Sequence, residues 1–194
     1  MVMKRNLRQL SSWYFLIAFV AATGIFVFSY RNNNLTALRL RDQLLADDKA
    51  GLHVEKSLGD LRGYIYSHMN ANLSGGPGSI YPPIQLTGTY QRAVEQAKQR
   101  ADAANAQAKI DAVAACEAQF PGRRTGYLLC LQNYEAAHTA VPQTIPDSLY
   151  KFDFVAPTWS PDKAGWSLVA AALFLMLFLI RFVAEIWLRH SLQD

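Results

Sequence analysis

Two stretches of the 194-residue chain consist almost entirely of apolar residues, and aromatic side chains mark their ends. The first, residues 13–30, contains no charge; with the two serines before it, the run makes about 30 Å of helix, the thickness of a membrane's hydrocarbon core. The second, residues 164–188, is uncharged up to Arg181. Tryptophan and tyrosine favour the head-group level of a bilayer. The pattern therefore predicts two transmembrane helices, at 13–30 and 164–188.

In the second predicted transmembrane helix, Arg181 and Glu185 are four residues apart and can pair on one helix face.

The first apolar run also has a second interpretation, a cleaved signal peptide. Lys4, Arg5 and Arg8 form a basic flank, and small residues at 20–22 suit a cleavage site. The apolar residues continue to Phe28, however, further than the core of about 7–15 residues that a signal peptide requires. We therefore interpret the run as a retained anchor and keep cleavage as the alternative.

The distribution of charge predicts the orientation of the chain. Its net charge is +4, of which residues 1–12 carry +3, residues 31–165 carry +1, and the tail from Arg181 carries none. Short basic flanks remain cytoplasmic. We therefore expect a cytoplasmic (plasma) membrane protein with a cytoplasmic flank at 1–12, an exoplasmic segment at 31–163 and a cytoplasmic tail at 189–194. The near-neutral segment between the spans argues against nucleic-acid binding.

Helical spacing dominates the first part of the exoplasmic segment. Leucines at 38, 45 and 52, followed by apolar residues at steps of three and four up to Met69, predict a helix that continues from the membrane to Leu73, with a break near Gly51. The glycine-rich stretch 74–79 ends it. A second helix is expected at 89–120 and a third at about 125–138, separated by a Pro-Gly pair at 121–122. The predicted buried stripe of the second helix is Tyr90, Val94, Ala97, Ala101, Ala104, Ala108 and Ala115.

Four prolines between residues 142 and 161 exclude a long helix there, while alternation over 150–155 predicts an extended strand. We expect this segment to return to the membrane and to pack Tyr150, Phe152 and Phe154 onto the helices. The predicted fold class is an all-α membrane protein. Two transmembrane helices flank an exoplasmic antiparallel helical bundle, which an extended, proline-containing return segment closes.

The chain has two cysteines, one on each side of the Pro-Gly break. In an antiparallel helical hairpin, Cys116 and Cys130 come close together, and the oxidising side of the membrane favours a disulfide between them. Such a bond would stabilise the hairpin by roughly 3 kcal/mol. Two free, buried thiols are the alternative.

Residue patterns that indicate catalysis are scarce. His53, His68 and His138 are not spaced as a helical metal pair, and no serine lies in a nucleophile elbow. We therefore expect no enzyme activity, no bound metal and no cofactor, with a cell-envelope hydrolase as a remaining alternative.

A polar and aromatic cluster precedes the glycine-rich stretch. We single out Tyr64, His68, Asn70 and Asn72 as residues that can contact a partner or a small-molecule ligand. The alternative is that these side chains satisfy the backbone where the helix ends.

The segments HMNANL (68–73), YPPIQL (81–86) and FDFVAPTWSPDKAGWSL (152–168) resemble small two-span membrane proteins of reduced-genome bacteria, a group without an assigned activity. The two-span layout is also similar to that of bacterial chemoreceptors and sensor kinases, but few residues follow the second span here, so their signalling output is missing. It further resembles polysaccharide chain-length regulators, with Pro157 and Pro161 before the second span, although their exoplasmic domain is larger.

Together these features predict an exoplasmic interaction or scaffold protein, an accessory or assembly subunit of a cell-envelope complex that binds a protein partner or a second copy of itself. Small residues on the second exoplasmic helix and at 170–172 suit helix association. The alternative is an exoplasmic ligand-sensing module that signals through a separate cytoplasmic partner.

Overall fold

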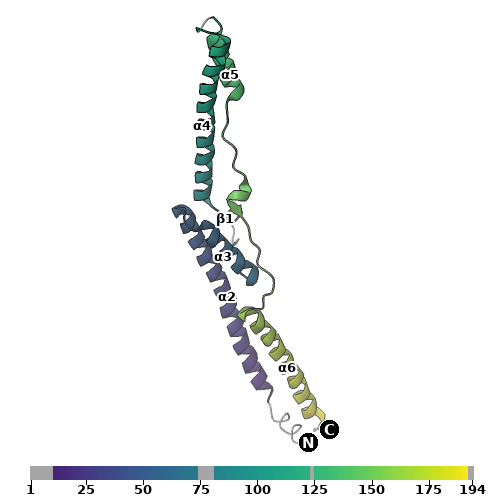
Figure 1. The fold of residues 1–194 in the computed structure, drawn as a ribbon. Helices are drawn as coiled ribbons and strands as arrows, with labels where there is room; N and C mark the ends of the chain where they lie inside the picture. Colours follow the sequence, from purple (N-terminus) through teal and green to yellow (C-terminus); the bar gives the residue numbers. More distant parts are fainter. Residues whose placement is uncertain (1–10, 74–80, 123–124, 192–194) are drawn as a thin grey trace. The chain divides into compact units, whose positions relative to one another are not determined.

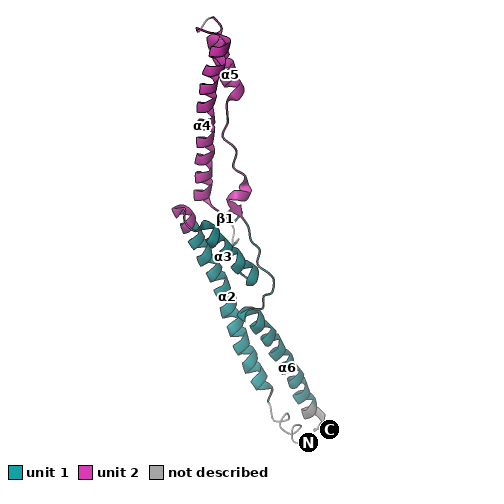
Figure 2. Ribbon diagram, in the orientation of Figure 1, with its two compact units in different colours: residues 1–46, 53–83, 153–194 teal, residues 47–52, 84–152 magenta. Residues whose placement is uncertain are grey.

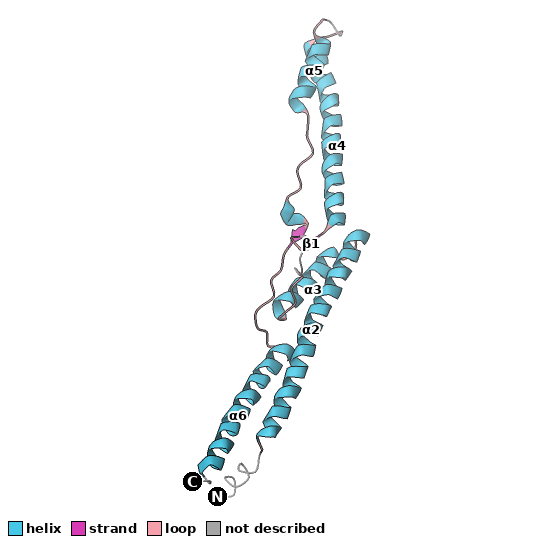
Figure 3. Ribbon diagram, turned by 180° about the vertical axis from the view of Figure 1, so that it is seen from behind, coloured by secondary structure: helices cyan, strands magenta, loops and turns pink. Residues whose placement is uncertain are grey.

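The computed structural model describes residues 11–73, 81–122 and 125–191 (Figure 1). The predicted basic flank with Lys4, Arg5 and Arg8, the glycine-rich stretch 74–79 and the last three residues lie outside the described residues. The described part is mostly helical, as predicted, with two very short strands (Figure 3). Its elements are α2 (Ser12–Ala50), α3 (Val54–Ser67), β1 (Ile84–Gln85), α4 (Thr87–Gln119), α5 (Tyr127–His138), the 3₁₀ turn η2 (Asp147–Leu149), β2 (Lys151–Phe152) and α6 (Lys163–Ser191).

Two of these helices, α2 and α6, are long and apolar enough to cross a membrane. In the most apolar stretch of each helix, only 17% and 11% of the residues are buried by the rest of the chain. Large side chains such as Ile17, Phe28, Met176 and Trp187 are instead exposed. An apolar helix whose side chains face outward is what contact with lipid requires, because within a bilayer the hydrocarbon covers them.

Polar contacts join α2 and α6 at both ends of their apolar runs. At one end the backbone N–H and the hydroxyl of Ser12 each donate to the Glu185 carboxylate at 3.1 Å; at the other the Asn33 amide donates to Asp162 at 2.6 Å. The two helices are therefore antiparallel, and the 22 residues from Ser12 to Asn33 span about 32 Å, close to the thickness of a hydrocarbon core. The buried side chains between these ends are small, which permits close approach of the two helices; they are Ala22, Ser29, Ala164, Ser167 and Ala171.

The chain forms two compact units (Figure 2). Unit 1 comprises residues 1–46, 53–83 and 153–194, and it contains α3, α6 and most of α2. Unit 2 comprises residues 47–52 and 84–152, and it contains α4, α5 and both strands. The helices between the two apolar runs are thus divided between two units.

The buried side of α2 differs from the line of leucines by whose spacing the helix was predicted. Leu45 and Leu52 are 38% and 60% exposed, so these leucines do not mark the buried face. The side chains that are buried are Asn33, Ala37, Leu44 and Asp48, at steps of four, seven and four. Two of the four are polar, and for that reason an apolar periodicity selects the neighbouring leucines instead.

In unit 1, α3 lies along α2 (Figures 1 and 3). Its Leu61 and Ile65 are fully buried, as are Ala37 and Leu44 of α2. The predicted break is confirmed: α2 ends at Ala50, and Gly51 has a φ of 72°, the left-handed conformation that commonly ends a helix. The second helix of this segment ends at Ser67 and not at Leu73 as predicted.

In unit 2, α4 and α5 form the predicted hairpin. The buried residues of α4 are Ala101, Ala112 and Cys116, whereas Tyr90, Val94, Ala104 and Ala115 of the predicted stripe are exposed. Ala101 is thus the one member of the predicted stripe that is buried, and the stripe is wrong over most of its length.

The extended return segment covers another part of α4. Asn105 of α4 binds the backbone of Ala140 twice, accepting from its N–H at 2.7 Å and donating to its carbonyl at 3.1 Å. Further along, the rings of Tyr90 and Tyr150 lie 4.7 Å apart. β2 then pairs antiparallel with β1, in the register Ile84 with Phe152. The extended return was predicted, but its pairing with β1 was not.

Gly165 in the first turn of α6 provides a test of this packing. A Cβ at this position would overlap the carbonyl oxygen of Ser160, which is backbone and cannot move aside. We expect Gly165→Ala to lower the melting temperature of the detergent-purified chain, at a cost of about 1–3 kcal/mol. Gly63→Ala is the matched control. Nothing lies within 4 Å of a Cβ at position 63. Alanine, which has a higher helix propensity than glycine, should therefore stabilise the folded chain by up to about 1 kcal/mol. Equal effects of the two substitutions would contradict the close approach.

Candidate functional site

A cleft of about 280 Å³ in unit 1 lies where the two apolar runs end. Its lining comes from three helices and their flanks. These residues are Phe28, Ser29, Asn32 and Asn33 of α2, Tyr64 of α3 with His68 just after it, and Asp162 with Lys163 at the start of α6. The cleft therefore lies between both candidate spans and α3, and most of the residues that line it are polar or charged.

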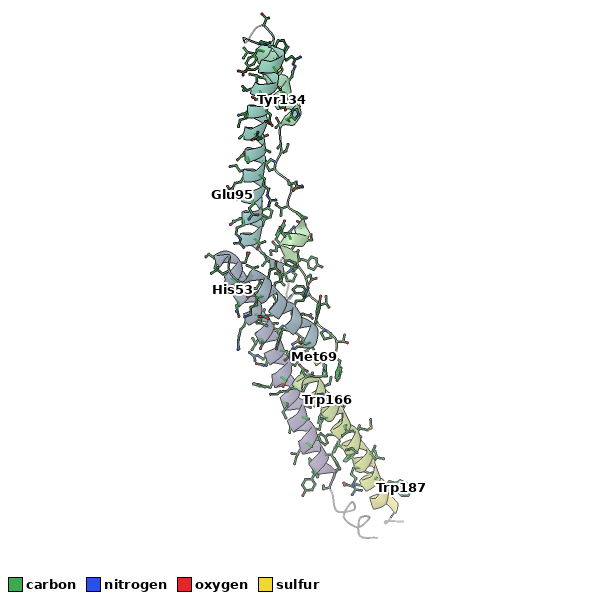
Figure 4. The ribbon with its side chains drawn as sticks, in the orientation of Figure 1. His53, Met69, Glu95, Tyr134, Trp166 and Trp187 are labelled. Carbon is green, nitrogen blue, oxygen red and sulfur yellow. A yellow bond between two sulfur atoms is a disulfide. The ribbon has the colours of Figure 1, made fainter. Side chains whose placement is uncertain are left out.

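Buried polar groups hold the walls of this cleft together. The Asn33 amide donates to the Asp162 carboxylate and also, at 3.2 Å, to the carbonyl of Met69. The N–H of Met69 donates to the hydroxyl of Ser160 at 2.9 Å. We call Asn33, Ser160 and Asp162 the polar clamp. Figure 4 shows Met69 and Trp166 on the neighbouring elements that it joins.

Asp162 also caps α6. Its carboxylate accepts the N–H of Gly165 at 2.8 Å, and its carbonyl accepts the N–H of Trp166 at 3.0 Å, as an N-cap residue does. Partial burial acts to raise the pKa of Asp162, but hydrogen bonds from Gly165, Asn33 and Ser160, with the nearby His68, together lower it below its usual 3.8. The carboxylate is therefore ionised at neutral pH, and Lys163, the next residue in the sequence, lines the same cleft.

The four residues singled out from the sequence have two different positions. Tyr64 and His68 stack, with ring centroids 4.0 Å apart, and both line the cleft. Asn70 instead donates to the carbonyl of Tyr30 at 3.0 Å, and Asn72 accepts the N–H of Ala156 at 3.0 Å. The two asparagines thus bind backbone.

These backbone contacts also explain why α3 ends early. Asn70 has a φ of 60°, and the Asn34 amide donates to the carbonyls of both Asn70 and Asn72. Backbone groups after Ser67 therefore find partners outside the helix.

The sequence prediction did not include Asn33, Ser160, Asp162 or Lys163. The signal that could have revealed them is the group of polar residues at the inner end of each apolar run.

A second polar centre, in unit 2, joins the end of α2 to the start of α4. Asp48, whose side chain is 3% exposed, accepts the N–H groups of Gly88 and Thr89 at 2.7 Å each. It also accepts the Thr89 hydroxyl at 2.6 Å and Arg92 at 3.1 Å. Asp48 thereby caps a helix that begins about 40 residues away in sequence, at a position where the N-cap Leu86 offers no side-chain acceptor.

The α4–α5 hairpin carries the predicted disulfide. Cys116 and Cys130 are bonded, with their Cα atoms 5.9 Å apart. The same hairpin exposes several large apolar side chains: Ile110 at 64%, Val113 at 41%, Leu128 at 73% and Leu129 at 60%. Leu129 and Cys130 also line a shallow depression beside the stacked rings of Tyr134 and His138. An outward-facing apolar group on a cross-linked hairpin is suited to contact with another molecule.

Among the described residues, no group of three or more His, Cys, Asp or Glu side chains is arranged to hold a metal ion. No protein-family model, curated protein or solved structure matches the chain.

Proposed function

We propose that this chain is a membrane-anchored interaction protein whose α4–α5 hairpin docks a protein partner on the exoplasmic side. The observation that carries the proposal is the exposure of Leu128 and Leu129 on a hairpin cross-linked by a disulfide. Binding is favoured when a partner buries exposed apolar side chains. A covalently constrained surface also loses little conformational entropy on binding. The role is that of an accessory or assembly subunit of a cell-envelope complex.

The exoplasmic placement of the hairpin can be tested by thiol labelling. Thr144 is exposed and the two native cysteines are bonded, so Thr144→Cys adds a single reactive thiol. We expect a membrane-impermeant maleimide to label it in intact cells, or in spheroplasts if an outer membrane is present. Gln193→Cys is the control, since a cytoplasmic tail should react only after lysis. Labelling of Thr144→Cys only after lysis would reverse the proposed topology.

The partner contact can be tested by charge substitution. Because the Leu128 side chain is 73% exposed, Leu128→Asp should leave the melting temperature unchanged but reduce cross-linked, co-purified partner by about tenfold or more. Val155→Asp is the matched control, since Val155 is also exposed, at 70%, and lies outside the hairpin. If both variants retain the same partners, the hairpin is not the docking surface. The mass of the purified chain shows whether the partner is a second copy.

A second candidate function, an exoplasmic ligand-sensing module, is supported by the cleft. Its lining includes residues of both α2 and α6, so a ligand bound there would contact both candidate spans. Under this alternative, a soluble ligand raises the melting temperature of the full-length chain, and Leu128→Asp does not alter its function.

A further inference from the structure

The cleft between α2, α3 and α6 lies at a defined level of the proposed membrane protein. Phe28 and Ser29 belong to the last turn of the first apolar run, and Lys163 immediately precedes the second. If both runs cross a bilayer, as the proposed function requires, the cleft opens at the level of the lipid head groups. Phe28 in its lining is 74% exposed, and Trp166, which lies outside the lining in the first turn of α6, is 61% exposed.

Charges of both signs line the cleft. Lys163 supplies an exposed ammonium, while Tyr64, Ser29 and Asn32 supply uncharged donors. Asp162 supplies a carboxylate that accepts hydrogen bonds from Gly165, Asn33 and Ser160. The two oxygens of a carboxylate offer about four lone pairs together, so this one retains capacity for one further donor. The site therefore offers donors to an anion and an acceptor to a cation, side by side.

We propose that this cleft binds the head group of a phospholipid that carries both a phosphate and a primary ammonium, with the phosphate on Lys163 and the ammonium on Asp162. A lipid with a phosphate alone would place its charge beside the Asp162 carboxylate without an ammonium to compensate. A quaternary ammonium has no N–H to donate to that carboxylate. The exposed Phe28 and Trp166 would contact the glycerol and the upper acyl chains. The proposal rests on the proposed membrane anchoring.

The test is lipid retention by the full-length chain. The chain is incorporated into nanodiscs of equimolar phosphatidylethanolamine, phosphatidylglycerol and phosphatidylcholine and then extracted in mild detergent, and the co-purified lipids are quantified. We expect phosphatidylethanolamine to be enriched, and Lys163→Gln to reduce the amount of lipid retained about tenfold, the effect of losing one charge-assisted hydrogen bond. Lys56→Gln, which removes the same charge from the exposed side of α3, should change nothing.

Asp162→Asn tests the ammonium contact separately. Asparagine caps helices as well as aspartate does, so α6 retains its cap while the charge is lost. We expect this variant to retain lipid but no longer to prefer phosphatidylethanolamine over phosphatidylglycerol. Retention of its melting temperature would show that the change is one of recognition.

Three results would overturn the proposal: equal retention of all three lipids, an unchanged amount of retained lipid in Lys163→Gln, or displacement of the lipid by inorganic phosphate, which would make the cleft a site for a free anion. A chain that enters the nanodiscs without lipid preference refutes the head-group site alone. A chain that does not enter them refutes the membrane anchoring itself.

Discussion

Replacement of Asp48 by alanine should release the first turn of α4. The substitution removes the acceptor for the Gly88 and Thr89 N–H groups and for the Thr89 hydroxyl, and it removes the charge that faces Arg92. Hydrogen bonds to a charged acceptor contribute about 1.5–3 kcal/mol each, although not additively. We expect the local stability of this junction to fall by about 3–5 kcal/mol. Hydrogen exchange at the Gly88 and Thr89 N–H groups should then become faster by roughly a hundredfold or more, the factor to which that free energy corresponds.

Two further variants identify the cause of this effect. Asp48→Asn keeps a capping oxygen and should lose less than Asp48→Ala. Asp42→Ala is the matched control, because the Asp42 side chain is 65% exposed and pairs with the adjacent Arg41; we expect a change of less than about 1 kcal/mol. If Asp48→Ala changes exchange at Gly88 no more than Asp42→Ala does, the carboxylate does not cap α4.

Loss of the disulfide should have the second large effect. The cysteines are 14 residues apart, and a loop of that length gives roughly 3 kcal/mol in the chain-entropy model. α5 has only 12 residues, and Tyr127 is the residue that it buries. A helix this short is marginally stable in isolation, because the free-energy cost of nucleation exceeds the stabilisation that a few helical turns provide. We therefore expect Cys116→Ala/Cys130→Ala to expose α5 to proteolysis and to accelerate its hydrogen exchange.

The reducing agent provides the control for the disulfide. Dithiothreitol should make α5 of the natural chain as protease-sensitive as in the double variant, and it should have no effect on that variant. Partner capture should fall in parallel if the hairpin is the docking surface. A natural chain whose α5 is equally resistant before and after reduction would show that packing alone retains this helix.

Much of the secondary structure follows from local pattern. The apolar length of α2 and α6, the glycine at 51 and the Pro-Gly pair at 121–122 each act within a turn or two of the backbone, so they predict helices, a break and a hairpin without reference to distant residues. The Cys116–Cys130 pairing follows from the same hairpin. The leucine spacing of α2 and the predicted stripe of α4 did not identify the buried faces, because the partner that covers each face is not encoded in the helix that carries it.

The polar clamp and the Asp48 cap depend instead on segments far apart in the chain. Asn33 meets Asp162 across 129 positions, and Asp48 meets Gly88 across 40. An apolar periodicity cannot indicate such pairs, since it treats a buried asparagine or aspartate as a surface residue. A buried polar group is stable only when its partners are brought to it. For this chain, length and apolarity suffice to predict the helices, whereas the cleft and its charges exist only because folding brings three helices together.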